Sequence, residues 1–522
     1  MKRLLYQIHR WVGIALAVFM SLWFLSGLVI MYSDASALNR AEQLAHAQSL
    51  QPQSGWLSLG QAWERSAIQR QMLFDGKPAT IIDARLVRQG AEARWLIEDS
   101  QGKRFALSAI NGRLDGASVN DAASIARHWT GDERTDIRYI DTGAQDSAVR
   151  NYEALRPFHR FAIGDGSREL LVSAITGEVV RDSTRLDRAL YWTGNWIHLL
   201  RPLETLGLSA DTRRTVLTWL GGFAFAGALT GLIIGWQRWR PGWGGRATYS
   251  QGRKQPYREF WFKWHFWTGL LGGSFALLWA FSGYLNGNPF GLFSPAAPNR
   301  AELLRYQGSS LPASMRDWRP SAFVTDTDNR DIVELAWRRL GDTTVLLGLT
   351  RDGRRLPQPV DGGSLHFQTS ALLAAAERLT DKTPVASQAL ITEYDSYYYA
   401  RRGQAAFDRP LPVLQIDLAD AAATRLYLDP QDGRLLLRQD TSRRAYRWLW
   451  SAIHHWDIGW LAQRPLWDAW MLTWVLMGVV LGSSSVVIGW KRLKKTFHAD
   501  KPAPRQTDTS RAAKPMAVTQ GQ

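Results

Sequence analysis

The sequence contains no cysteine among its 522 residues. This absence excludes disulfide bonds, iron–sulfur clusters, thiolate zinc sites and the C-x-x-C-H attachment of c-type haem. Histidine is also scarce, with 10 residues, whereas tryptophan, which favours the membrane interface, is abundant, with 26. Any haem in this protein must therefore be held without covalent bonds.

Acidic residues are almost absent from one segment between two apolar runs. From Gln237 to Trp264 there is one acid, Glu259, and a second basic cluster follows the last apolar run. The net charge of +16 and the pI near 10.1 would suit a nucleic-acid-binding protein. The position of the charge argues against that function, because positive charge beside apolar spans marks the cytoplasmic side of a membrane protein. The two clusters comprise Arg238, Arg240, Arg246, Arg253, Lys254, Arg258, Lys263, Lys491, Arg492, Lys494 and Lys495.

Charged residues are also missing from four long apolar windows, Trp11–Tyr32, Thr215–Trp236, Phe266–Gly287 and Ala469–Trp490. Each window is long enough for an α-helix that crosses the hydrocarbon core of about 30 Å. The first would also suit a signal peptide, but Tyr32-Ser33-Asp34 is a poor cleavage site, so we predict an uncleaved anchor. The expected fold class is an α-helical membrane protein with four transmembrane helices and two extracytoplasmic domains.

The basic clusters assign a side of the membrane to each segment. With the basic loop and tail inside, both termini are cytoplasmic, and the two long polar segments lie outside, in the periplasm of a bacterium with an inner membrane. The predicted organisation is 1–32 for the N-terminus and first span, 33–187 for the first periplasmic domain, 188–236 for an interfacial helix and the second span, 237–264 for the basic loop, 265–287 for the third span, 288–443 for the second periplasmic domain, 444–490 for an interfacial helix and the fourth span, and 491–522 for a basic, partly disordered tail.

Both outer segments combine amphipathic helices with short strands, which predicts two α+β domains. Helices are expected at Leu57–Gln71 and Val119–Trp129 in the first segment, and at Arg330–Leu340 and Ser370–Leu379 in the second. Neither segment has a G-x-G-x-x-G after a strand or a P-loop, so no nucleotide-binding domain is predicted. The expected strands are Thr80–Leu86, Ala93–Ile97, Arg104–Ile110, Arg156–Ile163, Glu169–Ile175, Glu178–Arg181, Thr343–Leu349, Val413–Leu418 and Thr424–Leu428.

The second half of the chain repeats the first with a shift of 256 residues, which predicts two tandem repeats. The shift places His265 on His9 and His454 on His198, so each copy holds histidines at the same two positions. The other matched residues are Trp11 with Trp267, Gly13 with Gly269, Trp23 with Trp279, Ser26-Gly27 with Ser282-Gly283, Thr176-Gly177 with Asp432-Gly433, and Arg188 with Arg444.

The predicted topology separates the four matched histidines into two levels. His9 and His265 precede spans that run outward, whereas His198 and His454 precede spans that return to the cytoplasm. A pseudo-two-fold axis normal to the membrane would bring the members of each level together. Two imidazoles close both axial positions of a haem iron, and such an iron transfers electrons rather than binding oxygen. We therefore expect two b-type haems, whose irons are bound by His9 with His265 and by His198 with His454.

Each histidine also has an ordinary explanation as an interfacial residue, because a duplication copies structural residues too. The ligand interpretation is favoured because ionisable groups beside membrane helices are costly and tend to be functional. His455 competes with His454, although the repeat favours His454 because Leu199 takes the matching place in the first copy. Arg188 and Arg444 are candidate contacts for haem propionates, with ordinary surface charge as the alternative. No catalytic residue is predicted.

These motifs resemble the PepSY-associated transmembrane family. The resemblance rests on Ile8-His9-Arg10-Trp11-Val12-Gly13, on Trp264-His265-Phe266-Trp267-Thr268-Gly269, on the Leu-Tyr-Leu-Asp-Pro-Gln-Asp-Gly run at 426–433, and on Ile-Gly-Trp at 234–236 and 488–490. It covers nearly the whole chain apart from the tail. Members of this family include inner-membrane di-haem reductases of ferric siderophores, so the resemblance implies bis-histidine haem b and a role in iron acquisition.

Residues and resemblance together predict an inner-membrane di-haem electron-transfer protein, an oxidoreductase of the ferric-siderophore reductase type. Its donor would be a cytoplasmic reductant or quinol, and its acceptor a periplasmic ferric siderophore. One alternative is a haem-free PepSY membrane protein that binds peptides or regulates a protease or sensor. Another is a metal or siderophore transporter, which is disfavoured because transporters place polar groups near the membrane midplane.

Overall fold

A computed structural model describes residues 2–33, 38–73, 80–132, 134–143, 152–323, 331–401 and 407–499. The chain forms two compact units. The helical unit consists of Met1–Phe24, Phe223–Leu277 and Leu476–Gln522, and the sheet unit consists of Leu25–Gly222 and Leu278–Val475. Each unit contains segments from both halves of the chain, so residues far apart in the sequence pack together in both of them.

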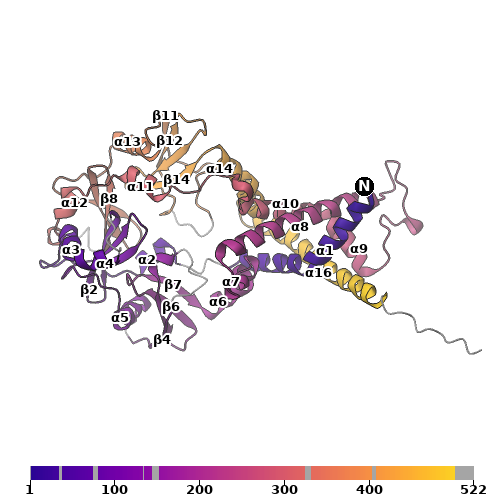
Figure 1. Ribbon diagram of the computed structural model, residues 1–522, viewed down its shortest axis with the longest axis horizontal. Helices are drawn as coiled ribbons and strands as arrows, with labels where there is room; N and C mark the ends of the chain where they lie inside the picture. Colours follow the sequence, from indigo (N-terminus) through magenta and orange to yellow (C-terminus); the bar gives the residue numbers. More distant parts are fainter. Residues whose placement is uncertain are drawn as a thin grey trace, which may run out of the picture. The chain divides into compact units, whose positions relative to one another are not determined.

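Three of the described helices are long and apolar enough to cross a membrane, α1 (Lys2–Ile30), α8 (Ala210–Arg238) and α16 (Leu466–Ala499). A further candidate is a bent pair, α9 (Phe260–Leu271) with α10 (Gly273–Asn286) (Figure 1). The four predicted apolar windows fall within these elements or run one or two residues past their ends. The chain is therefore a multi-pass membrane protein, with a fourth span if the bent pair forms one.

The predicted third span is a continuous helix, whereas the structure bends it by 63° between α9 and α10. Two successive glycines, Gly272 and Gly273, stand at the break, and glycine has a low helix propensity. A side chain at Gly272 would stand 3.1 Å from Cβ of Met477, and one at Gly273 would stand 3.0 Å from Cδ2 of Leu232. The two glycines thus permit close approach to α16 and α8 while weakening the helix locally.

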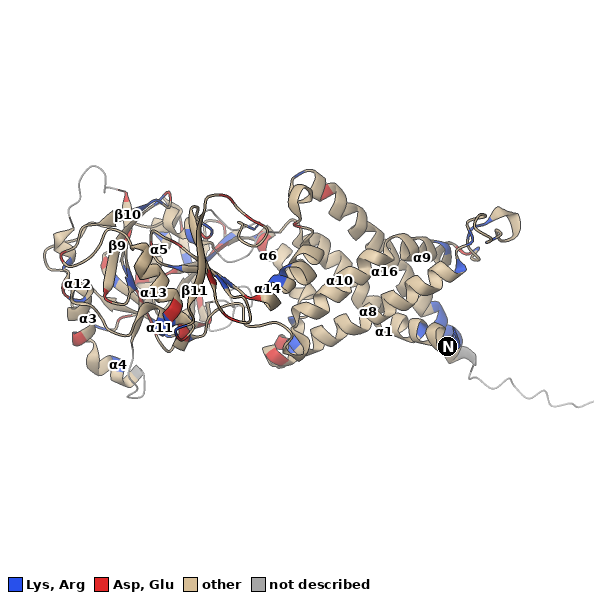
Figure 2. Cartoon of the chain, turned by 90° about the horizontal axis from the view of Figure 1, so that it is seen from above, with Lys and Arg blue, Asp and Glu red and all other residues tan. Residues whose placement is uncertain are grey.

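The helical unit is strongly basic. Figure 2 shows the middle parts of α1, α8 and α16 without charged side chains and basic residues gathered toward the end where α1 begins. Among the described residues of this unit, fourteen lysines and arginines face one acid, Glu259, which pairs with Lys491. The fourteen are Lys2, Arg3, Arg10, Arg238, Arg240, Arg246, Arg253, Lys254, Arg258, Lys263, Lys491, Arg492, Lys494 and Lys495. Such an imbalance fits the side of a membrane protein that remains in the cytoplasm.

In the sheet unit, strands from both halves of the chain form one six-stranded antiparallel sheet, in the order β10-β9-β8-β1-β2-β3. The halves meet where β1 pairs with β8, with Arg85 opposite Ala336. Sequence analysis assigned these two parts of the chain to separate outer domains, and the pairing of β1 with β8 joins them in one sheet. The strands are β1 (Ile81–Gln89), β2 (Glu92–Asp99), β3 (Arg104–Ser108), β8 (Ile332–Leu340), β9 (Thr343–Thr350) and β10 (Arg355–Gln358).

The helix predicted at Arg330–Leu340 is wrong, because Ile332–Leu340 forms strand β8; Arg330 lies outside the described residues. Its residues include good helix formers such as Glu334 and Leu335, and their polar and apolar spacing resembles a helix. Most side chains on both faces of β8 are buried, so the strand lacks the alternation that identifies a half-exposed strand. Pairing with β1 and β9 on either side overrides the local propensity.

Each half of the sheet unit also contributes a four-stranded antiparallel sheet packed against a helix. In the first half, α5 (Val119–Thr130) packs on the sheet β4-β5-β6-β7, and in the second half α13 (Thr369–Leu379) packs on β11-β12-β13-β14. Both helices and most of these strands were predicted within a few residues. The strands are β4 (Ile137–Gly143), β5 (Phe158–Ile163), β6 (Arg168–Ser173), β7 (Val179–Thr184), β11 (Val385–Ile391), β12 (Val413–Leu418), β13 (Arg425–Leu428) and β14 (Leu435–Gln439).

Shorter helices connect these parts. The helix predicted at Leu57–Gln71 is two helices, α3 and α4, which are separated at Ser66. The short elements are α2 (Arg40–Ala45), α3 (Leu59–Arg65), α4 (Ala67–Leu73), α6 (Arg185–Tyr191), α7 (Pro202–Thr205), α11 (Arg300–Gln307), α12 (Ala313–Asp317), α14 (Thr441–Tyr446) and α15 (Ile453–His455), with π-helices η2 (Trp192–Trp196) and η6 (Arg447–Ala452) and 3₁₀ turns η3 (Ser250–Gly252), η4 (Pro289–Gly291), η5 (Pro320–Ala322) and η7 (Gly459–Ala462).

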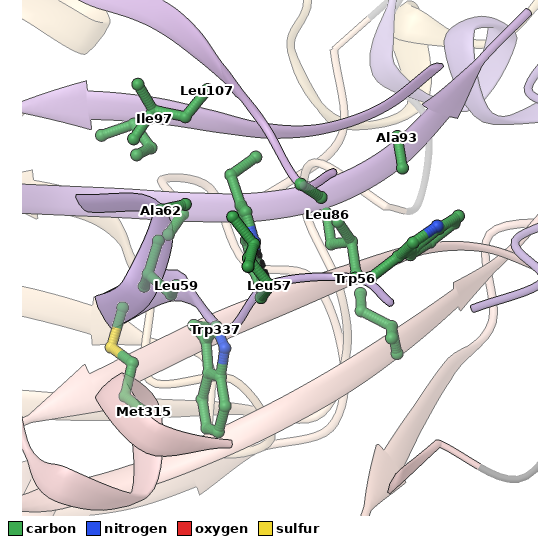
Figure 3. Close-up of a cluster of buried hydrophobic side chains, with 14 of the residues drawn as sticks. Trp56, Leu57, Leu59, Ala62, Leu86, Ala93, Ile97, Leu107, Met315 and Trp337 are labelled. Carbon is green, nitrogen blue, oxygen red and sulfur yellow. Dashed lines mark hydrogen bonds between the residues drawn. The ribbon is translucent and has the colours of Figure 1, made fainter. Parts of the chain in front are cut away.

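The largest core of the sheet unit contains side chains from both halves of the chain (Figure 3). Trp95 of β2 and Trp337 of β8 are almost completely buried, and Met315 of α12 packs in the same cluster as Leu59 of α3. Large aromatic side chains supply much of the apolar area that folding removes from water. Neither half can therefore complete this core without the other.

Buried charged residues lie at the junction of the two halves. Glu334 of β8 is 3% exposed and accepts hydrogen bonds from Arg40 and Arg85, while Arg85 donates to Glu178 at 2.8 Å. Burial raises the pKa of Glu178, but the guanidinium groups of Arg85 and Arg104 outweigh burial and hold that pKa below its ordinary value. These ion pairs connect α2, β1 and the turn before β7 with β8.

Replacing Glu334 with alanine should destabilise the sheet unit, because Arg40 and Arg85 would lose a buried carboxylate. The expected cost is about 3–5 kcal/mol, which is typical when one partner of a buried ion pair is removed. It is measured as a lower thermal midpoint of the full-length protein in detergent, monitored by tryptophan fluorescence. Asp317→Ala is the control, because its ion pair with Arg316 is exposed and should contribute less than about 1 kcal/mol. Equal effects of the two substitutions would contradict this assignment.

Candidate functional site

The helical unit brings together two of the predicted histidines, His9 of α1 and His265 of α9. Their ring centroids are 6.2 Å apart, and their ring planes make an angle of 45°. Each ring of this pair, called the inner pair below, also contacts a second helix, α8 in the case of His9 and α16 in the case of His265. Residues separated by 256 positions in the sequence thus face one another.

Backbone and hydroxyl oxygens fix the orientation of both inner rings. Nδ1 of His9 lies 3.0 Å from the carbonyl oxygen of Gly227, which accepts hydrogen bonds but cannot donate one. Nδ1 of His265 lies 3.3 Å from the hydroxyl oxygens of Ser484 and Ser485, and both hydroxyls donate to the carbonyl oxygen of Leu481. In both rings Nδ1 therefore carries the proton, and the lone pair of the neutral imidazole is on Nε2.

Gly231 of α8 provides the space that the ring of His9 occupies. A Cβ atom at Gly231 would stand 2.7 Å from Cε1 of His9, which is closer than real Cβ contacts allow, and a tight 3.1 Å from its Nδ1. Glycine at this position thus lets the imidazole lie directly against the α8 backbone. In the sequence, Gly227 and Gly231 belong to a small-residue pattern typical of helix packing, and the structure adds a specific requirement at each of them.

The sheet unit brings together the other two predicted histidines, His198 and His454. Their ring centroids are 6.5 Å apart, with an interplanar angle of 77°. Each of these outer histidines follows a π-helical segment, η2 before Ile197-His198 and η6 before Ile453-His454. A π-helical turn holds an additional residue and is frequent at functional sites, because it redirects the side chains that follow.

Two serines hold the outer rings in the same way. Nδ1 of His198 lies 3.1 Å from Oγ of Ser26, and Nδ1 of His454 lies 2.9 Å from Oγ of Ser282. Each serine precedes its histidine by 172 residues. Because the Ser282 hydroxyl donates to the carbonyl oxygen of Trp279, it accepts the proton on Nδ1 of His454 and leaves the lone pair on Nε2.

The structure distinguishes His454 from its neighbour His455. The ring centroid of His454 is 6.5 Å from that of His198 and 4.2 Å from that of Trp450, whereas Nδ1 of His455 is 3.2 Å from the carbonyl oxygen of Ser451 in its own helical turn. Burial, together with His455 and His198, lowers the pKa of His454 well below its ordinary value. The imidazole of His454 is therefore neutral at physiological pH, as a metal ligand must be.

The geometry of both pairs suits two axial ligands on one haem iron. Two imidazoles that bind a metal ion from opposite sides through bonds of about 2.0–2.1 Å have ring centroids about 6 Å apart. A haem iron takes only its axial ligands from the protein, so a pair of histidines is sufficient. Among the residues that the structure describes, no group of three or more His, Asp or Glu side chains could hold a metal ion.

The predicted propionate contacts, Arg188 and Arg444, both reach back to the four-stranded sheets. Nη1 of Arg188 donates to the carbonyl oxygen of Ser183 at 2.8 Å, and Nη1 of Arg444 donates to that of Ala423 at 2.9 Å. Arg188 also pairs with Glu169 at 3.4 Å. These contacts give both arginines a structural role in attaching α6 and α14 to the sheets, and a role toward haem propionates stays a prediction.

Sequence analysis did not assign the residues that orient the histidines. Ser26 and Ser282 were noticed as repeat-matched residues, but no local pattern relates them to histidines 172 residues away. The contributions of Ser484 and Ser485 are equally hidden, since their hydroxyls act on His265 of another helix. An internal comparison of both halves for matched polar residues on apolar helices is the signal that would have found Ser26 and Ser282.

A model of the PepSY-associated TM region matches residues 6–322. The matched range includes His9, His198 and His265, together with α1, α8 and the bent pair α9 and α10. No curated protein matches the sequence. Because the match covers more than half of the chain, the protein belongs to the PepSY-associated transmembrane family.

Proposed function

We propose that this protein is a di-haem b electron-transfer protein that delivers electrons across the membrane. The observation that supports the proposal is the pair of facing histidines in each unit, with ring separations of 6.2 and 6.5 Å. One non-covalent haem would be bound by His9 and His265 and the other by His198 and His454. A haem bound in this way supplies reversible one-electron transfer between its ferric and ferrous states.

The protein's own contribution is to present the four imidazoles in a fixed orientation. The oxygen atoms of Gly227, Ser282, Ser484 and Ser485 accept the Nδ1 protons so that Nε2 can bind iron, and Oγ of Ser26 contacts Nδ1 of His198. Such supporting hydrogen bonds typically change metal affinity by about 10–100-fold.

The proposed setting is a bacterial inner membrane that the chain crosses four times in two tandem repeats, and the basic clusters favour cytoplasmic termini and an acceptor in the periplasm. The proposed acceptor is a ferric siderophore. Hard oxygen ligands, which siderophores commonly provide, bind Fe(III) more tightly than Fe(II), so one-electron reduction would release the iron. The proposed activity is therefore that of an oxidoreductase in iron acquisition, with electrons entering on the cytoplasmic side.

Alanine substitutions should remove the two haems separately. His9→Ala and His265→Ala should each remove the inner haem, and His198→Ala and His454→Ala should each remove the outer haem, because the haem would lose one of the two imidazoles proposed to hold it. Haem per chain and the visible spectrum of the purified variants measure the outcome. His455→Ala is the matched control and should retain both haems, since its ring hydrogen-bonds within its own helical turn. Loss of all haem from one well-folded variant would contradict the two-site assignment.

Gly231→Ala should remove the inner haem and spare the outer one. Its methyl group would stand 2.7 Å from Cε1 of His9 and push the ring out of line with His265. Gly235→Ala is the matched control, because it lies one turn further along α8 and its Cβ position is 3.4 Å from Cδ1 of Leu270, an ordinary contact. The measurement is haem content, which should fall to about half in Gly231→Ala and stay unchanged in Gly235→Ala. A Gly231→Ala protein that keeps both haems would show that His9 does not bind iron in this position.

The reduced protein should transfer electrons to a ferric trihydroxamate. The chemically reduced protein is mixed without oxygen with the chelate and a chromogenic Fe(II) trap, and haem oxidation is followed together with formation of the Fe(II) complex. Both should rise together in the wild type, and His454→Ala should slow them at least about tenfold if the outer haem faces the acceptor. Reduced haem that persists in the presence of the chelate would exclude this acceptor class.

A further inference from the structure

The loop between α8 and α9 carries a dense, ordered positive charge. Figure 2 shows this loop extending beyond the helix ends of the helical unit, with basic residues along it. Cation–π contacts and hydrogen bonds to backbone carbonyls hold its arginine side chains in place. The one acid in the loop, Glu259, pairs with Lys491 rather than with these arginines. Arg240 lies over Tyr249 at 4.4 Å, and Arg246 lies over Trp236 at 5.1 Å. The positive charge of the loop is thus left uncompensated within the chain's described residues.

The loop has a defined conformation. The amide of Arg240 donates to the carbonyl oxygen of Lys254 at 2.9 Å, and that of Tyr249 donates to Arg253 at 2.8 Å, so the two sides of the loop are paired. The hydroxyl of Tyr249 donates to the carbonyl oxygen of Arg238 at 3.0 Å, which attaches the loop to the end of α8. Because the backbone of the loop is held by these hydrogen bonds, its charged residues occupy defined positions, unlike those of a flexible polybasic tail.

The base of the loop adjoins the inner histidine pair. Arg238 donates to the hydroxyl groups of Tyr6 and Tyr257. Tyr6 lies one helical turn before His9 in α1, and the ring of Tyr257 lies 6.1 Å from that of Phe266, the neighbour of His265. The charged surface therefore stands directly over the elements that present the inner pair.

We propose that this loop is the docking surface for an acidic soluble electron-carrier protein that reduces the inner haem. The inference rests on the proposed function and names its donor class. The carrier, a reduced flavoprotein or iron–sulfur protein, gives up one electron and becomes oxidised, and the ferric iron held by His9 and His265 becomes ferrous. No atom is transferred. Electron-transfer encounters use small interfaces, and complementary charge steers and orients them.

A protein partner fits this surface better than a lipid surface. Lipid-binding polybasic segments lie in the interface plane, where anionic headgroups attract them. This loop instead extends past the helix ends (Figure 2) and exposes Trp243, at 68%, together with its charged side chains. Aromatic and arginine side chains are enriched in protein interfaces. An anionic lipid surface is the alternative partner, and the experiment below distinguishes it from a protein.

The test uses the full-length protein in detergent and an acidic flavodoxin as the probe. Lys254 and Arg258, both exposed, are replaced in the double variant Lys254→Glu/Arg258→Glu. The control is Arg113→Glu/Arg127→Glu, which makes the same charge change on exposed residues of the sheet unit. Binding of fluorescently labelled flavodoxin is titrated at low and high salt, and haem reduction by flavodoxin hydroquinone is then followed by stopped flow.

Wild type and control should bind flavodoxin at low salt and lose it at high salt, whereas Lys254→Glu/Arg258→Glu should bind and react about tenfold more weakly. Equal binding by all three proteins, or rapid reduction by duroquinol with none by flavodoxin, would overturn the docking proposal. So would a double variant that binds flavodoxin normally but loses co-purified anionic phospholipid. Because binding is measured without reference to haem, a haem-free protein that still binds flavodoxin would refute the proposed function and leave the surface intact.

Discussion

The hydrogen bond at Nδ1 of each paired histidine is the interaction on which the proposed chemistry depends. An imidazole beside apolar helices can turn, exchange tautomers or bind a proton, and each of these would leave no lone pair on Nε2 directed toward a metal ion. The carbonyl of Gly227 and the hydroxyls of Ser282, Ser484 and Ser485 accept the Nδ1 proton and so leave the lone pair of His9, His454 and His265 on Nε2. These oxygens therefore determine what the paired histidines can bind.

Different groups orient the imidazole rings in the two histidine pairs. The inner pair relies on a backbone carbonyl for one ring and on two serines for the other, and it needs a glycine so that the first ring fits. The outer pair uses one serine for each ring, and π-helical segments precede both histidines. Hydrogen-bond strength at Nδ1 affects the basicity of the imidazole. The two sites are therefore expected to differ in reduction potential, which would give electron flow a direction.

Patterns within short segments of the sequence predicted the elements whose structure depends on those segments alone. The apolar windows located α1, α8 and α16, because the length of a membrane helix follows from its own composition. The bend at Gly272 and the strand at 332–340 were missed, since contacts with Met477, Leu232 and β1 decide them. The histidines were found through the internal repeat, a long-range signal within one sequence. Their oxygen partners were not, because a hydrogen bond between residues 172 positions apart leaves no pattern in either segment.

The central claim, that each histidine pair holds a haem, is tested most directly by the reduced-minus-oxidised visible spectrum of the purified protein, with haem counted per chain. The account predicts sharp low-spin b-type bands and about two haems per chain, as four axial histidines require. A protein that remains colourless when haem is supplied would contradict the account. The paired histidines would then be interfacial residues, and a peptide-binding or regulatory role for this PepSY-associated membrane protein would replace electron transfer.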